Sequence, residues 1–202
     1  VVADEVTSIG YAAFYNCTFT TLNIGEKVKN IPNYTFYNCG GLTTVNFNAT
    51  NCTSMGSSVW HNCTSLTTLN IGERVKNIPD YAFYDCSALT GSLAIPDSVT
   101  NIGINAFYGC TALTAINFNA NNCTTMANSS NPVFYNCTSL TTINIGEDVK
   151  NIPNYAFYNC SGLTGTLTIS DSVTNIGTYA FGNCSSIDTV TIGNSVENIG
   201  EN

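Results

Sequence analysis

The chain has 202 residues, of which 44% are hydrophobic and 9% are charged. This apolar content excludes intrinsic disorder, and no apolar run approaches the roughly 18 residues that a membrane-spanning helix requires, so we expect no membrane insertion. Five basic and thirteen acidic side chains give a net charge of −8, which repels phosphate backbones and argues against nucleic-acid binding.

One short pattern recurs along the whole chain, and each copy contains an aromatic residue followed three positions later by a cysteine. Successive cysteines of this pattern lie 22 to 27 residues apart, a period typical of solenoids. A single copy cannot bury its own apolar residues, so we expect one domain over residues 1–202. The pairs are Phe14/Cys17, Phe36/Cys39, Trp60/Cys63, Phe83/Cys86, Phe107/Cys110, Phe134/Cys137, Phe157/Cys160 and Phe181/Cys184.

Each coil is expected to contain two strands and one tight turn. In the first coil, residues 21–24 alternate polar and apolar, which predicts a half-buried strand. The same segment of every coil would stack into a parallel sheet with a spacing of about 4.8 Å. Residues 28–31, Val-Lys-Asn-Ile, predict a second short strand. The Ala-Phe-x-x-Cys segment is too short for a stable helix, so we expect one helical or 3₁₀ turn there.

A longer repeat of three coils is superimposed on the short one. Cys39 and Cys110 are 71 residues apart, and Cys110 and Cys184 are 74 residues apart, with closely similar stretches between them. This indicates duplication of a three-coil unit. Residues 89–93 and 163–167 each carry one extra residue and a glycine, which predicts a β-bulge in both units.

Residues 95–110 follow the pattern I-P-x-x-V-x-x-I-G-x-x-A-F-x-x-C through a whole coil. This pattern resembles the leucine-rich repeats of the BspA-like (Treponema pallidum) type. With the resemblance we expect an α/β leucine-rich-repeat solenoid, mostly β and right-handed, with about eight coils. It would have a parallel sheet, a second sheet of short strands and short 3₁₀ or helical turns. Cys52/Met55 and Cys123/Met126 depart from the pattern, where Val and Ile are expected.

The ten cysteines are expected to be reduced thiols that pack in the core. Eight of them share one position in successive coils, so their Cβ atoms would lie about one rung, ~4.8 Å, apart, beyond the ~3.5–4.5 Å that a disulfide prefers. The sequence has no Cys-x-x-Cys motif for a zinc or redox site. Disulfide bonds are the alternative, and we expect neither a metal nor a cofactor.

The sequence offers no recognisable catalytic group. Its one histidine, His61, follows Trp60 at a position where most other coils carry tyrosine, and it has no evident partner. Acidic residues are scattered over turns, and the glycines recur at coil turns without forming a phosphate-binding loop. We therefore expect no enzymatic activity.

The eleven tyrosines all lie in the segments before these cysteines, and ten of them fall into two columns. Stacking of rings one rung apart would explain the columns by packing alone, whereas an amphipathic aromatic stripe could also bind a protein or a sugar. The column two residues before the core aromatic contains Tyr34, Tyr81, Tyr155 and Tyr179. The column that follows the core aromatic supplies the candidate binding residues Tyr15, Tyr37, Tyr84, Tyr108, Tyr135 and Tyr158.

A second candidate surface is the outward face of the main sheet, which is uncharged and rich in threonine and asparagine. The β-propensity of threonine explains part of this composition without any ligand. The monotony of the face favours weak, multivalent contacts over one tight site. Its candidate binding residues are Asn23, Asn46, Asn70, Asn117 and Asn144.

From these features we expect a non-catalytic interaction module. The family resemblance implies an adhesin-like protein at the cell surface or secreted, whose extracellular partner is a host protein or a glycan. The alternative is a structural spacer that displays another domain. Neither end carries a polar cap or a signal peptide, so we expect a fragment of a longer repeat array. The sequence leaves the oligomeric state open.

Overall fold

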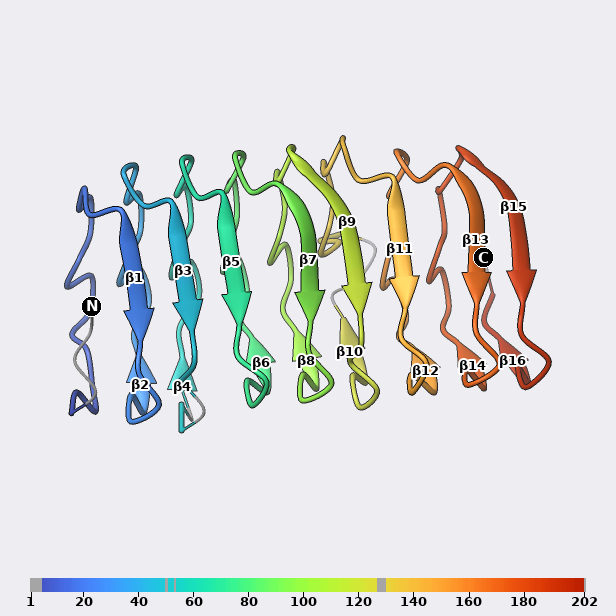
Figure 1. The fold of residues 1–202 in the computed structure, drawn as a ribbon, viewed down its shortest axis with the longest axis horizontal. Coiled ribbons are helices and arrows are strands. Elements are labelled where there is room, and N and C mark those ends of the chain that lie inside the picture. The colour runs from blue at the N-terminus through green and yellow to red at the C-terminus, as the bar shows by residue number, and fades with distance from the viewer. Residues whose placement is uncertain (1–4, 50, 53, 127–129, 202) are drawn as a thin grey trace.

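The computed structural model describes residues 5–49, 51–52, 54–126 and 130–201, which form a parallel β-solenoid (Figure 1). Each coil contributes one longer strand and one strand of two residues, and the coils stack along a single axis. The longer strands are β1 (Thr21–Ile24), β3 (Thr44–Phe47), β5 (Thr68–Ile71), β7 (Gly91–Ile95), β9 (Leu113–Phe118), β11 (Thr142–Ile145), β13 (Gly165–Ile169) and β15 (Ile187–Ile192). The two-residue strands are β2 (Asn30–Ile31), β4 (Ser54–Met55), β6 (Asn77–Ile78), β8 (Asn101–Ile102), β10 (Thr125–Met126), β12 (Asn151–Ile152), β14 (Asn175–Ile176) and β16 (Asn198–Ile199).

The longer strands confirm the predicted parallel register. Leu22 of β1 pairs with Val45 of β3, and Val45 pairs with Leu69 of β5. Ile116 of β9 pairs with Ile143 of β11 in the same way. All five of these side chains are buried, so the alternation along these strands places their apolar residues in the core and their Thr and Asn residues on the outer face.

The main row of strands is interrupted at the same place in both three-coil units. Its sheets have the orders β1-β3-β5, β7-β9-β11 and β13-β15, and the intervals from β5 to β7 and from β11 to β13 are the wide ones in Figure 1. The strand after each interruption begins at a glycine with positive φ, Gly91 at 75° and Gly165 at 73°, and the register shifts there. The predicted bulges are therefore confirmed. Pro96 contributes to the first interruption because its nitrogen cannot donate a hydrogen bond, whereas the corresponding Gly72 N–H donates to the Phe47 carbonyl.

The segment before each cysteine is not helical in the described residues, which corrects the expected α/β class and the helical or 3₁₀ turns. The segment consists of successive turns, one of which is closed by the Tyr37 N–H and the Tyr34 carbonyl at 3.1 Å. A right-handed helix cannot continue through Tyr34 and Asn38, whose φ values are 59° and 56°. The Phe36 N–H instead donates to the Val59 carbonyl of the next coil at 3.0 Å. This segment therefore adds a third ladder between coils.

The core is built around a row of stacked aromatic rings that runs from Phe14 to Phe181. The centroids of successive rings lie 4.8–6.0 Å apart, with interplanar angles of at most 19°. Beside this row the Cys39 thiol donates to the Phe14 carbonyl of the preceding coil at 3.0 Å, and five further coils repeat the bond. The ring row and the thiol bonds hold the outer columns of the solenoid one rung apart.

Candidate ligand-binding surfaces

Five of the six candidate tyrosines lie in one continuous stack on the outside of the solenoid. The stack runs through Tyr15, Tyr37, His61, Tyr84, Tyr108 and Tyr135. Its centroid distances are 5.2, 4.8, 4.5, 4.4 and 5.5 Å in that order, and its interplanar angles are at most 24°. Each inner ring therefore has both faces covered by neighbouring rings, and it presents only its edge and its polar atoms to solvent.

Tyr158 is separate from this stack. Its ring makes edge contacts with Tyr155 and Tyr179, at interplanar angles of 83° and 89°, and its hydroxyl accepts a hydrogen bond from the Asn183 amide at 3.1 Å. Among the described residues no ring contact joins Tyr158 to Tyr135. The predicted tyrosine stripe is therefore interrupted between the coils of these two residues.

A hollow of about 420 Å³ occupies this interruption, and Tyr108, Tyr135 and Tyr158 contribute to its walls. The hollow lies beside two successive coils that carry Asn105 and Pro132 at the second-column position. Four of the other six coils place a tyrosine at that position. The hollow was not predicted from the sequence, although Asn105 and Pro132 interrupt the second tyrosine column there.

His61 acts as a packing residue within the tyrosine stack. Burial lowers its pKa, an effect that the nearby negative charge of Asp85 partly opposes. Its Nδ1 is buried and has no hydrogen-bond partner among the described residues. The ring is therefore neutral at physiological pH and is held between Tyr37 and Tyr84.

The candidate asparagines of the sheet face hydrogen-bond to one another instead of standing free. The Asn46 amide donates to Asn23 Oδ1 at 2.5 Å, and the Asn70 amide donates to Asn46 Oδ1 at 2.8 Å. On the next sheet the Asn144 amide donates to Asn117 Oδ1 at 2.8 Å. The structure therefore brings the five residues together as two ladders, one on each side of the interruption between β5 and β7. Each ladder leaves part of its amide groups to solvent.

Shallow grooves mark both interruptions of the main row. The groove between β5 and β7 has a volume of about 320 Å³, and the one between β11 and β13 has about 360 Å³. In each groove one long backbone hydrogen bond near the start of the strands still joins the two sides. In the first groove the Thr90 N–H donates to the Thr67 carbonyl at 3.4 Å, and in the second the Thr164 N–H donates to the Thr141 carbonyl at 3.3 Å. The grooves therefore expose strand edges at equivalent places in the two units.

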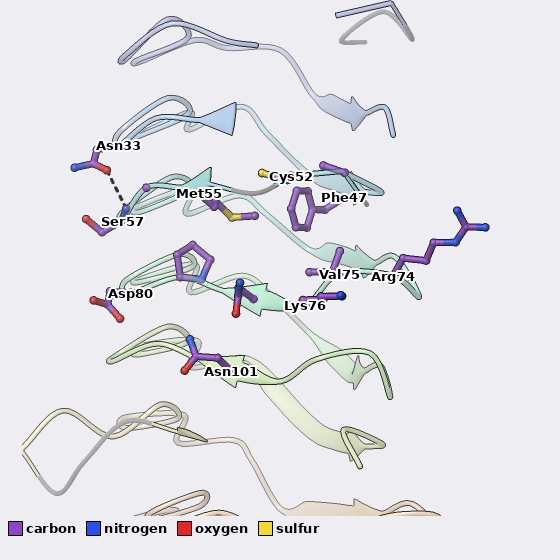
Figure 2. Close-up of a pocket in the computed structure, with 14 residues that line it drawn as sticks. Asn33, Phe47, Cys52, Met55, Ser57, Arg74, Val75, Lys76, Asp80 and Asn101 are labelled. Atoms are coloured by element: carbon purple, nitrogen blue, oxygen red, sulfur yellow. Dashed lines mark hydrogen bonds between the residues drawn. The ribbon is translucent and has the colours of Figure 1, made fainter. Parts of the chain in front are cut away.

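A larger pocket of about 690 Å³ lies where the row of two-residue strands is interrupted between β4 and β6 (Figure 2). Phe47 and Met55 lie in its middle, Arg74 extends away from them, and Asp80 lies at the opposite end. Lys76 is the third charged residue of the lining. Because Arg74 and Asp80 lie at opposite ends, their charges do not converge on one bound group. Cys52 and Met55 depart from the repeat pattern at this interruption, but Cys123 and Met126 share the departure and are buried, so the departure alone did not predict the pocket.

The cysteines are reduced thiols, as predicted. Burial raises the pKa of Cys86 to about 12 and that of Cys123 to about 11, and it also raises the pKa of Cys160. These thiols therefore stay protonated at neutral pH, when they are poor nucleophiles and poor metal ligands. Within the described part of the chain, no group of three or more His, Cys, Asp or Glu side chains could hold a metal ion.

Comparisons with known proteins agree with this architecture. A family model described as the BspA-type leucine-rich repeat region, in six copies, matches residues 1–90 and 76–202. The chain is similar to the T. pallidum leucine-rich repeat protein TpLRR, with 20% identity over 86% of this chain and 72% of that chain and a TM-score of 0.59, a likeness that shows the leucine-rich repeat fold. A search of curated proteins gave no match.

Two further solved structures are similar at lower TM-scores. A leucine-rich repeat protein from Bacteroides ovatus has 22% identity, with 96% of this chain and 78% of that chain covered and a TM-score of 0.42. A leucine-rich cell surface protein from Faecalibacterium prausnitzii has 20% identity, with 93% and 83% covered and a TM-score of 0.31. Among the described residues, no helix is long and apolar enough to span a membrane.

Proposed function

Because this chain belongs to the family of BspA-type leucine-rich repeat proteins, we propose that it is a non-catalytic, adhesin-like interaction module. Leucine-rich repeats of this type generally mediate protein interactions. The proposed setting is the cell surface or the extracellular space, and the proposed partner is a host protein or a glycan. We also propose that residues 1–202 act as a single repeat domain.

The observation that supports this proposal is the pair of regular, uncharged surfaces, the tyrosine stack and the sheet face, that the stacked coils present. The ring stack from Tyr15 to Tyr135 spans six coils, and the sheet face carries Thr and Asn at successive rungs. Aromatic edges and amide groups are common contact groups in binding surfaces. Their repetition at each rung suits several weak contacts at once, which together give useful avidity.

A binding screen with two sets of variants tests this proposal. The purified chain is presented to a panel of extracellular-matrix proteins and to a glycan array. One variant set changes Tyr84, Tyr108 and Tyr135 to Ala, and the other changes the sheet-face residues Thr44 and Thr68 to Arg. Loss of a partner in either set, with an unchanged circular dichroism spectrum, supports the proposal and identifies the binding surface. Absence of any partner in both panels contradicts it.

A structural spacer is the second candidate function, and the core supports it. The row of stacked aromatics continues from Phe14 to Phe181, so the coils repeat along one axis without a hinge residue in this row. A spacer would bind nothing in the screen, and it would tolerate deletion of one whole three-coil unit without loss of its biological role.

A further inference from the structure

We propose that the hollow between Tyr135 and Tyr158 binds a neutral oligosaccharide, with one sugar ring lying on the uncovered face of Tyr135. This inference deepens the proposed function and rests on it, because it assigns one ligand class to one place on the tyrosine stripe. The tyrosine stack ends at Tyr135, the lining of the hollow is uncharged, and the second tyrosine column is missing beside it.

The end of the ring stack provides a free aromatic face. A ring inside the stack has neighbours on both faces, whereas Tyr135 stacks on Tyr108 and on no other described ring. The exposures agree: Tyr135 is 39% exposed and Tyr15, at the other end of the stack, is 48% exposed, while Tyr37, Tyr84 and Tyr108 are half-buried. The C–H face of a pyranose ring packs on such an aromatic face in the way that the next tyrosine would.

The far wall of the hollow is also aromatic. Tyr158 belongs to the next coil, and its ring packs on the backbone of Gly182, which occupies the column position one coil further on. A Cβ added at Gly182 would lie 3.0 Å from the Tyr158 ring, so one face of that ring is covered by the chain. Tyr135 and Tyr158 therefore bound a slot that no described ring fills.

The remaining lining offers paired donors and acceptors without charge. The described residues around the hollow include the amides of Asn105, Asn159 and Asn183 and no Asp, Glu, Lys or Arg. The Asn159 side chain makes no hydrogen bond with another described residue, and the Asn183 amide uses one N–H on Tyr158. An amide both donates and accepts, as a sugar hydroxyl does. This chemistry favours a neutral sugar over a charged peptide or an anion.

The hollow exists because two coils lack a second-column tyrosine that the backbone could accommodate. Asn105 has a φ of 51°, and Tyr81 and Tyr155 occupy the same position in other coils at 54° and 55°. The backbone at this position therefore accepts tyrosine. With Asn105 and Pro132 in its place, a volume of about 420 Å³ stays open, within the ~300–1,000 Å³ range of small-molecule sites.

Filling the hollow is the sharpest test. The variant Asn105→Tyr places a ring where other coils already carry one, so it should fold and should block the site. The matched control is Ala12→Tyr, because Ala12 has the same column position and a φ of 47° but lies near the other end of the solenoid. A second pair removes a ring: Tyr135→Ala takes away the stacking face, and Tyr11→Ala removes a tyrosine that is 70% exposed elsewhere.

The probes are fluorescein-labelled linear oligosaccharides of mannose, galactose and N-acetylglucosamine, and binding is followed by fluorescence polarisation. We expect at least one probe to bind, with about tenfold weaker binding to Asn105→Tyr and Tyr135→Ala and unchanged binding to both controls. Circular dichroism confirms that each variant is folded. Binding that survives Asn105→Tyr, or that is lost equally in Ala12→Tyr, overturns the assignment of the site.

A failure of this inference can be told from a failure of the proposed function. If no oligosaccharide binds but a matrix protein does, the sugar assignment is wrong and the interaction module stands. If a matrix protein binds and Asn105→Tyr abolishes that binding, the hollow is a protein site and the sugar assignment is again wrong. If neither class binds, both proposals are contradicted and the spacer is favoured.

Discussion

The two three-coil units share one sequence pattern but differ where the row of short strands is interrupted. Between β4 and β6 the first unit has the 690 Å³ pocket, with Cys52 and Met55 half-buried. Between β10 and β12 the second unit buries Cys123 and Met126, which are 0% and 1% exposed. The interruption of the ladder is therefore common to both units, whereas among the described residues the open pocket is found in the first.

One amide accounts for part of this difference. The Asn151 amide donates across the second interruption to the Cys123 carbonyl at 3.4 Å, and Asn151 Oδ1 accepts from the Asn175 amide at 2.6 Å. Asn77, the equivalent residue of the first unit, makes no side-chain hydrogen bond with another described residue. Arg74 is also replaced by Asp148 in the second unit. In the second unit a side chain therefore bridges the two coils across the interrupted ladder, whereas among the described residues the first unit has no such bridge at Asn77.

The strongest test of this comparison removes an equivalent core aromatic from each unit. Trp60 and Phe134 are 0% and 1% exposed and lie in the same stacked row. We expect Trp60→Ala and Phe134→Ala each to lower the free energy of unfolding by about 3–5 kcal/mol, measured by urea denaturation. Similar losses show that the units differ at the surface and not in the core. Two separate unfolding transitions would contradict a shared core.

Thiol reactivity should distinguish the units next. We expect Cys52 to react with iodoacetamide about 100-fold faster than Cys123 at pH 8, because Cys123 is buried and its pKa is raised to about 11. Mass spectrometry of timed samples locates the label. A raised pKa means that labelling of Cys123 should increase as the pH approaches 11. Equal rates at pH 8 would show that both interruptions are equally open.

The glycines at the main-row interruptions should behave alike in the two units. An added Cβ meets nothing within 4 Å at Gly91 or Gly165, so the cost of Gly→Ala comes from the positive φ alone and is about 1–2 kcal/mol. Gly40 is the matched control, because it also has open space but lacks a positive φ. Thermal unfolding measures all three variants. A neutral Gly91→Ala would show that the bulge does not need glycine.

The smallest effect concerns the bridging amide. Asn151→Ala should lose about 1 kcal/mol of stability, since it removes the hydrogen bond to the Cys123 carbonyl and the acceptor of the Asn175 amide. Asn77→Ala should be nearly neutral. The rate at which Cys123 reacts with iodoacetamide is then measured in the same variants. We expect Cys123 to react faster in Asn151→Ala. An unchanged rate would mean that other contacts close the second interruption.

The columns could be predicted because they depend on local pattern alone. Alternation along each strand and a constant period were enough to place Leu22 beside Val45 and Tyr84 beside Tyr108. The turns before the cysteines could not be predicted, because tyrosine at φ of 59°, as at Tyr34, is uncommon and is stabilised by hydrogen bonds to a neighbouring coil. The helical turn was predicted from the local sequence, which does not show these hydrogen bonds between coils.

The candidate sites were predicted by residue type but not by their connections. Sequence periodicity placed Asn23, Asn46 and Asn70 on one face, yet it did not reveal that their amides bond to one another. The hollow next to Tyr135 depends on the absence of a tyrosine at Asn105. The sequence columns show that absence, but the open volume follows from how neighbouring coils pack in space. A site that forms where a coil lacks a side chain of the repeating column is therefore the hardest kind to predict from a repeat sequence.

The one tryptophan of the sequence gives the first unit an optical reporter of its own. Trp60 is fully buried, with its indole ring between Phe36 and Phe83 at 6.0 and 4.8 Å. Its fluorescence emission should therefore be blue-shifted in the native protein and should move to longer wavelength when water enters that part of the solenoid. The second unit has phenylalanine at the corresponding place and is silent in this spectrum. Opening of the first unit can therefore be followed without a label and compared with the loss of secondary structure of the whole chain.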